Sequence, residues 1–75
     1  MRKNSKDIFR IFGENICNFR NERNMTIEEL SNITGIRKEY LKKIEKGVAR
    51  GVNASHIFIF ADAFDIKPCE IVKNL

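Results

Sequence analysis

The fold of this chain is decided by residues 25–47, which read MTIEELSNITGIRKEYLKKIEKG. Thr26 and Glu29 have the spacing of a capping box, in which each side chain pairs with the backbone N–H of the other residue at the start of a helix. Gly35 supplies the left-handed residue that commonly ends a helix. The stretch therefore predicts a short helix over residues 26–34. Its inward face is expected to carry Ile27, Leu30 and Ile33.

A second short helix is predicted over residues 37–46, and Gly47 ends its pattern in the same way. Its inward face carries Tyr40, Leu41 and Ile44. Its other face is charged and carries Arg37, Lys38, Glu39, Lys42, Lys43 and Lys46. Two short helices joined by a tight turn are typical of a helix-turn-helix unit, although an ordinary helical hairpin with a solvated charged face has the same spacing. The excess of cations favours DNA, because a protein that neutralises phosphates releases their counterions.

Upstream of this unit, one long helix is predicted over residues 5–24. Its apolar residues recur at spacings of three and four, and they are Phe9, Phe12, Ile16 and Phe19. Gly13 lies inside this helix, where glycine is less favourable than alanine by about 1 kcal/mol. We therefore expect a close packing contact at Gly13.

Downstream, Asn53 is a good N-cap for a helix that runs to Phe64, and Pro68 suits the first position of a short fifth helix. The buried stripe of the fourth helix is expected to hold Ala54, Ile57, Phe60, Ala61 and Phe64. The apolar residues of the fifth helix are Ile71, Val72 and Leu75. The whole pattern predicts an all-α fold of five helices that forms a single domain over residues 1–75.

The composition limits what such a domain can do. The chain has 75 residues, 43% of them hydrophobic, and a net charge of +4 that permits binding to nucleic acid without proving it. A single histidine, no Ser/His/Asp arrangement, no glycine-rich phosphate loop and no group of metal ligands argue against an enzyme. We expect no cofactor and no metal. Cys17 and Cys69 lie far apart and outside any C-x-x-C pair, so buried free thiols are expected.

Nothing in the sequence indicates a membrane partner. No run approaches 18 apolar residues, and the charged residues 1–7 are not followed by the apolar stretch of a signal peptide. We therefore expect a cytoplasmic protein.

Three stretches of the sequence, in order, resemble one known family. Residues 25–47 are similar to the phage repressor/Cro-like helix-turn-helix family, also called the XRE family, whose pattern begins L-[ST]-Q-E-E-L-A-x-x-[TSA]-G. Residues 16–20 (ICNFR) match the family's I-x-x-L-R, and residues 60–71 (FADAFDIKPCEI) match its I-A-x-A-L-x-[VI]-x-[PL]-x-[ED]-[LI]. The resemblance implies a compact five-helix, lambda-repressor-like domain with its helix-turn-helix at about residues 26–46.

The resemblance also implies roles for individual side chains. Base edges in the major groove would be read by Arg37, Lys38, Glu39 and Lys43, because Arg and Lys pair with guanine O6/N7 and Glu accepts from cytosine N4. Phosphates would be bound by Thr26, Lys42, Lys46 and Arg50. A structural ion pair would join Arg20 and Glu45. His56 has two interpretations, as a phosphate contact or as an ordinary, partly exposed residue.

The chain departs from the family pattern in three places. Ile27 replaces the glutamine that helps to anchor the first of the two short helices to phosphate, which leaves Thr26 and backbone N–H groups for that task. The second short helix has no side-chain cap at Ile36 or Arg37. The fourth helix is apolar where the family is often polar, which suggests either a well-filled core or a dimer interface. The candidate interface residues are Phe58, Ile59, Ile71, Val72 and Leu75.

The sequence thus favours a transcription regulator that binds double-stranded DNA sequence-specifically. As a homodimer it would place two recognition helices in successive major grooves, about 34 Å apart, on a roughly palindromic operator. The chain has no room for an effector domain, so we expect no small-molecule effector. The alternative is an antitoxin-type or protein-interaction module of a mobile element or a toxin–antitoxin pair.

Overall fold

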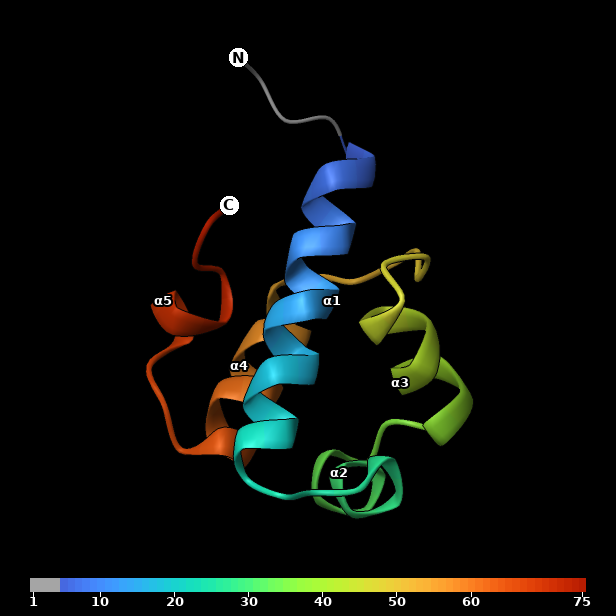
Figure 1. Cartoon of the computed structure of the whole chain (residues 1–75), viewed down its shortest axis with the longest axis vertical. Coiled ribbons are helices and arrows are strands. Elements are labelled where there is room, and N and C mark those ends of the chain that lie inside the picture. The colour runs from blue at the N-terminus through green and yellow to red at the C-terminus, as the bar shows by residue number, and fades with distance from the viewer. Residues whose placement is uncertain (1–4) are drawn as a thin grey trace.

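A computed structural model describes residues 5–75, with side chains from Lys6 onward. This part of the chain forms five helices and no strand, as the sequence predicts (Figure 1). The helices are α1 (Ser5–Glu22), α2 (Ile27–Thr34), α3 (Lys38–Glu45), α4 (Ala54–Phe64) and α5 (Pro68–Ile71). Residues 1–4, which belong to the charged start of the chain, lie outside the described residues.

The other helices are arranged around α1. Figure 1 shows α1 along the long axis of the molecule, with α3 on one side, α4 and α5 on the other, and α2 beyond the C-terminal end of α1. Helix α1 packs against α3, α4 and α5, and α2 packs against α3 and α4. This arrangement leaves the outer face of α3 uncovered.

The core is apolar and aromatic. Its buried residues are Phe12, Ile16, Phe19, Leu30, Leu41, Ile44, Ala49, Phe60, Ala61, Phe64 and Ile71. The rings of Phe12 and Phe60 meet edge to face at 6.1 Å between centroids, which joins α1 to α4. Most of the predicted inward-facing residues belong to this core or pack against it.

Two predicted inward-facing residues are exposed instead. Ile33 is 56% exposed, because α2 turns the side that carries Leu30 and Thr34 toward its neighbours and leaves Ile33 on the opposite edge. Ala54 is exposed because the first turn of α4 lies at the surface. In both cases the helical period was right, and the position of the residue relative to the neighbouring helices decided its exposure.

The predicted close contact at Gly13 is confirmed. A Cβ atom at Gly13 would clash with the backbone carbonyl oxygens of Ile44 and Glu45, at the end of α3. Nearby, Gly47 has a φ of +78°, and a Cβ atom there would lie 2.7 Å from the Cα of Arg10. Helices α1 and α3 therefore approach each other through backbone at these two glycines, which fixes the position of α3.

One polar side chain inside the core was missed in the sequence. Asn15 is buried, and its amide donates hydrogen bonds to the carbonyl oxygens of Ile71 (3.0 Å) and Lys73 (2.8 Å). Its signal was its position, since it falls on the apolar stripe of α1 between Phe12 and Phe19. Asn15 attaches the C-terminal segment to α1.

The two cysteines are free, but they differ in burial. Cys17 is half-buried, whereas Cys69 is exposed, so the expectation of a buried thiol is wrong for Cys69. The reason is that α5 forms a single turn that buries Ile71 and leaves Pro68, Cys69 and Glu70 at the surface. Within residues 5–75, no helix is both long and apolar enough to cross a bilayer.

Candidate nucleic-acid interface

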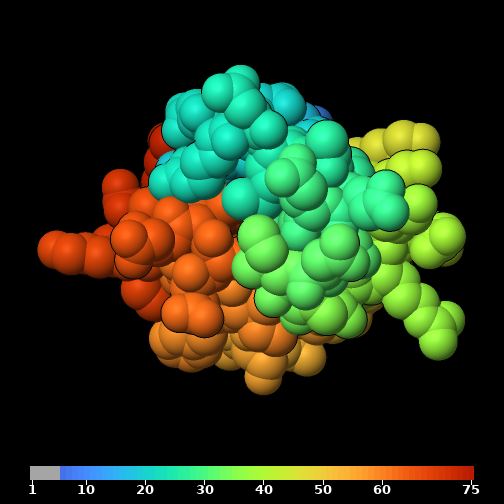
Figure 2. Space-filling view, turned by 90° about the horizontal axis from the view of Figure 1, so that it is seen from below, coloured from blue at the N-terminus to red at the C-terminus, as the bar shows by residue number. Residues whose placement is uncertain are grey.

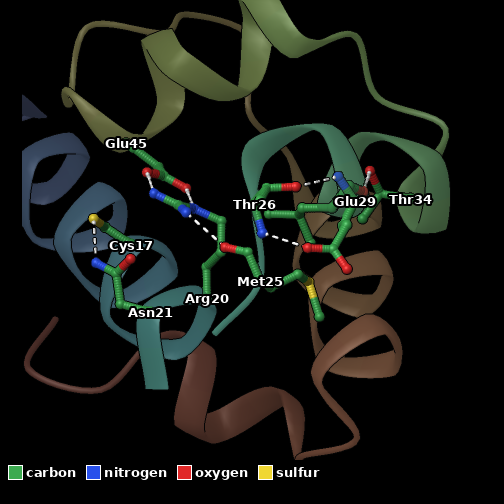
Figure 3. Close-up of polar contacts among 9 residues, drawn as sticks. Cys17, Arg20, Asn21, Met25, Thr26, Glu29, Thr34 and Glu45 are labelled. Atoms are coloured by element: carbon green, nitrogen blue, oxygen red, sulfur yellow. Dashed lines mark hydrogen bonds and ion pairs between the residues drawn. The ribbon is translucent and has the colours of Figure 1, made fainter. Parts of the chain in front are cut away.

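The start of α2 has the predicted capping box. The Thr26 hydroxyl oxygen accepts from the backbone N–H of Glu29 (3.0 Å), and the Glu29 carboxylate accepts from the backbone N–H of Thr26 (2.9 Å), as Figure 3 shows. Thr26 is exposed, and so are the carboxylates of Glu28 and Glu29 beside it. Any phosphate bound at Thr26 would therefore approach two acidic side chains.

The turn between α2 and α3 is held by side chains of α2. Gly35 adopts the left-handed conformation, with a φ of +77°. Beyond it, the backbone N–H of Ile36 donates to the Thr34 hydroxyl (3.1 Å), and the Ser31 hydroxyl donates to the carbonyl oxygen of Ile36 (2.5 Å). Arg37 is the N-cap of α3 and has no side-chain capping bond, as predicted. The start of α3 is thus positioned from α2.

The outer face of α3 consists of charged side chains. Leu41 and Ile44 are buried on its inner face. All of the predicted charged residues are exposed, namely Arg37, Lys38, Glu39, Lys42, Lys43 and Lys46. Among the described residues, no ion pair engages any of these side chains. In Figure 2, long side chains of this segment project from the body of the molecule, at the right of the view.

A hollow of about 470 Å³ lies beside the first turns of α3. It is lined by Ile36, Arg37, Glu39, Tyr40 and Lys43. Three of the four predicted base-reading residues therefore share one concavity, and Lys38 lies outside its lining. The hollow combines charged side chains with two apolar surfaces.

The loop after α3 is tied back to that helix. The Tyr40 hydroxyl donates to the carbonyl oxygen of Arg50 (2.6 Å), and the Tyr40 ring lies 6.0 Å from the ring of His56. His56 is half-buried, and its Nδ1 accepts from the backbone N–H of Asn53 (3.2 Å) at the start of α4. The guanidinium of Arg50 lies over the Phe9 ring, 5.5 Å from its centroid. The loop that carries Arg50 is thus fixed from α3, α4 and α1.

Arg20 and Glu45 meet in a two-bond ion pair. Arg20 Nε and Nη2 donate to the Glu45 carboxylate at 2.7 and 3.0 Å, and Arg20 Nη1 donates to the carbonyl oxygen of Met25 (2.8 Å; Figure 3). The hydrogen bonds to Glu45 raise the pKa of Arg20 above its ordinary value. This contact joins the end of α1 to the segment before α2 and to the end of α3.

Cys17 lies next to this ion pair. The Asn21 amide donates to the Cys17 sulfur at 3.4 Å (Figure 3). Burial raises the pKa of the Cys17 thiol, and the nearby Glu45 carboxylate raises it further. The thiolate form of Cys17 is therefore disfavoured.

The predicted dimer residues have different surroundings. Phe58 is 61% exposed, and Ile59 and Leu75 are also exposed, while Val72 is half-buried. Ile71 is fully buried in the core of one chain and offers no surface to a partner, so assigning it to an interface was wrong. An apolar groove of about 280 Å³ lies between the starts of α1 and α4 and the C-terminal segment. Its lining includes Ile8, Phe9, Ile57, Val72 and Leu75.

Comparison with known proteins assigns these features to a family. The helix-turn-helix family model HTH_3 matches residues 18–71. The chain belongs to this helix-turn-helix family. Its members of the XRE type are regulators of transcription that bind double-stranded DNA, and the chain is not an enzyme.

Individual relatives support the same assignment. Over 59 residues the chain is 34% identical to the control protein C.SmaI of Serratia marcescens, covering 79% of this chain and 69% of the relative. The structure is similar to the restriction-modification controller protein C.AhdI from Aeromonas hydrophila, with a TM-score of 0.78, 28% identity, and coverage of 84% of this chain and 94% of that chain. A hypothetical transcription factor from Neisseria, NHTF, shares the fold with a TM-score of 0.80 at 19% identity, over 96% of this chain and 82% of that chain.

Proposed function

We propose that this helix-turn-helix protein is a sequence-specific regulator that acts as a homodimer on a roughly palindromic operator. Helix α3 lies in the major groove, where base edges are read by Arg37, Lys38, Glu39 and Lys43. Phosphates are bound by Thr26, Lys42, Lys46 and Arg50. The observation that carries this proposal is the outer face of α3, whose charged side chains are exposed and form no ion pairs in the described part of the chain.

The proposed genes under its control are those of a restriction–modification system. Two relatives are named as control or controller proteins, and one of them is explicitly a restriction-modification controller. The proposed operator is therefore expected next to a restriction or modification gene in the source genome. If the operator lies next to no restriction or modification gene, this assignment is contradicted.

The size of the chain and its surface support the proposed homodimer. A 75-residue chain buries a comparatively small core, so a partner subunit adds stability. Exposed Phe58, Ile59 and Leu75, with the half-buried Val72, supply apolar area for this contact. Two copies would set their α3 helices about 34 Å apart, one turn of DNA.

In vitro selection of bound duplexes tests the proposed function directly. The expected result is an inverted repeat whose half-sites are centred about 10 base pairs apart, or a multiple of that spacing. Titration at two salt concentrations should show a steep loss of affinity with salt, because phosphate contacts release counterions. Salt-independent binding, or no binding to duplex DNA, would overturn the proposal.

The variant Lys43→Ala tests which side chains read bases. We expect operator binding to weaken by about 1–3 kcal/mol and the preference at one base pair to be relaxed. The exposed Lys67, between α4 and α5, is a matched control, and Lys67→Ala should leave both properties unchanged. If Lys43→Ala lost the same affinity for operator and random DNA, Lys43 would contact only phosphate.

A further inference from the structure

We infer that the hollow beside α3 receives the 5-methyl group of a thymine, and that Ile36 and the ring of Tyr40 are the surfaces that contact it. This inference rests on the proposed function, because it requires α3 to lie in the major groove. It adds Ile36 and Tyr40 to the residues that determine specificity, and neither belongs to the charged face of α3.

The lining of the hollow divides into two kinds of surface. Ile36 and Tyr40 are both half-buried and pack against the hydrophobic core, so each presents part of an apolar side chain to the hollow. The exposed side chains of Arg37, Glu39 and Lys43 complete the lining. The thymine methyl is the apolar group that base pairs present in the major groove. An apolar surface among hydrogen-bonding side chains therefore matches a thymine with polar base edges around it.

The backbone N–H and carbonyl of Ile36 and the hydroxyl of Tyr40 are already bonded. The backbone N–H of Ile36 donates to Thr34 and its carbonyl accepts from Ser31, at 3.1 and 2.5 Å. The Tyr40 hydroxyl donates to the carbonyl of Arg50 at 2.6 Å. What these residues offer to DNA is therefore aliphatic and aromatic surface. The same bonds hold the Ile36 backbone and the Tyr40 ring in place before DNA arrives, which reduces the entropy lost on binding.

The charged side chains around the hollow predict which base pair lies next to the thymine. Arg37 and Lys43 are suited to guanine O6 and N7, and Glu39 is suited to the N4 amino group of cytosine. All three remain outside any ion pair in the described part of the chain. We therefore expect the thymine that enters the hollow to be followed or preceded by a G·C pair in each half-site.

Replacing thymine by uracil tests the inference on the DNA itself. Deoxyuridine lacks only the 5-methyl group, so each thymine of a selected half-site is replaced in turn and the Kd is measured by fluorescence anisotropy. One position next to a G·C pair should lose about fourfold in affinity, the value that corresponds to removing one buried methyl group. The other positions should change less than twofold.

Two isoleucines of α2 and the turn after it give matched protein variants. In Ile36→Ala the difference in affinity between the thymine and uracil operators should shrink, because one of the two surfaces that contact the methyl group is gone. In Ile33→Ala the fourfold difference should persist, because Ile33 is exposed on α2 and does not line the hollow. If circular dichroism shows that Ile36→Ala is unfolded, Ile36→Val is used instead. It should retain the fold and reduce the fourfold difference in affinity between the thymine and uracil operators to about twofold.

The results separate this inference from the proposed function. Binding of a symmetric operator with no effect of uracil at any position, or with no thymine in the half-site, would overturn the methyl contact alone. So would a uracil effect that survives undiminished in Ile36→Ala, or in Ile36→Val where that variant is needed. Loss of binding to every duplex would overturn the proposed function and this inference together.

Discussion

At the scale of single residues, Arg20 is the side chain that ties the end of α1 to the end of α3. Its guanidinium bonds to Glu45 and to the carbonyl of Met25, and the side chains of Arg20 and Glu45 are only 15% and 10% exposed. Arg20→Met would leave the Glu45 carboxylate nearly buried without its partner. We expect a loss of about 3 kcal/mol in the free energy of unfolding, measured by urea denaturation.

The double variant Arg20→Met/Glu45→Leu is the control for this prediction. It removes both charges and should recover most of the lost stability, because an apolar pair can replace a buried ion pair. A double variant no more stable than Arg20→Met would contradict the explanation by an unpaired charge.

The two thiols should react at different rates. Burial and the Glu45 carboxylate raise the pKa of Cys17 in the folded protein, so Cys17 forms its reactive thiolate only at higher pH than an ordinary cysteine. Cys69 is exposed. Mass spectrometry after brief treatment with iodoacetamide at pH 8 should find Cys69 modified first. Cys69→Ser should then react slowly, and rapid modification of that variant would contradict the prediction.

The raised pKa of Cys17 also sets the sign of a pH effect. The folded state holds the thiol proton more tightly than the unfolded state does, so this contribution to stability is complete below the unfolded pKa. It is lost as the pH rises through the folded pKa. The pH dependence of stability that Cys17 adds is therefore confined to alkaline solution.

Residues whose roles follow from neighbours in sequence could be predicted, and several whose roles follow from packing could not. The Thr26–Glu29 capping box and the uncapped start at Arg37 follow from local chemistry. The exposure of Ile33 depends on where α3 and α4 lie relative to α2, which the helical period does not specify. The pairing of Arg20 with Glu45 was accessible only through the resemblance to the family.

At the scale of elements, α1 and α3 approach each other through backbone at Gly13. Gly13→Ala adds a methyl group where the backbone of Ile44 and Glu45 leaves no room. We expect a net loss of stability of about 1–3 kcal/mol from overpacking, although alanine alone favours a helix. The exposed Asn18 of the same helix is the control, and Asn18→Ala should slightly raise the melting temperature. A stabilising Gly13→Ala would contradict this contact.

The bounds of α1 to α4 could be predicted to within one or two residues because their ends carry strong signals, whereas α5 ends at Ile71, before the Val72 and Leu75 that the sequence assigned to it. Asn53 precedes α4, Pro68 opens α5, and Gly35 and Gly47 follow α2 and α3. The bonds between elements could not be predicted. Ser31, Thr34 and Tyr40 reach backbone atoms of the turn and of the loop after α3, and which atoms they reach depends on the path of the chain in space.

At the scale of the whole molecule, the proposed homodimer is the property most open to test. Phe58→Glu combined with Ile59→Lys places charges on the exposed apolar face of α4 and should produce monomers in sedimentation experiments. Ile33→Glu is the matched control, since it changes an exposed apolar residue on α2 and should leave dimers intact. If dimers persist in the α4 variant, the interface lies elsewhere, for example at the groove lined by Ile8 and Leu75.

The order in which this molecule can fold follows from the amide of Asn15. The carbonyls that it binds lie 56 and 58 residues further along the chain. During synthesis, contacts so distant in sequence must form last, and closing such a long loop carries a large entropy cost. Helices α1, α2 and α3 are complete long before that. Helices α1 to α3, which include the proposed DNA-binding face, can therefore assemble first, and the surface that carries Val72 and Leu75 is completed only after those residues have been made. In the proposed homodimer, pairing of two copies would therefore wait until this surface has been made.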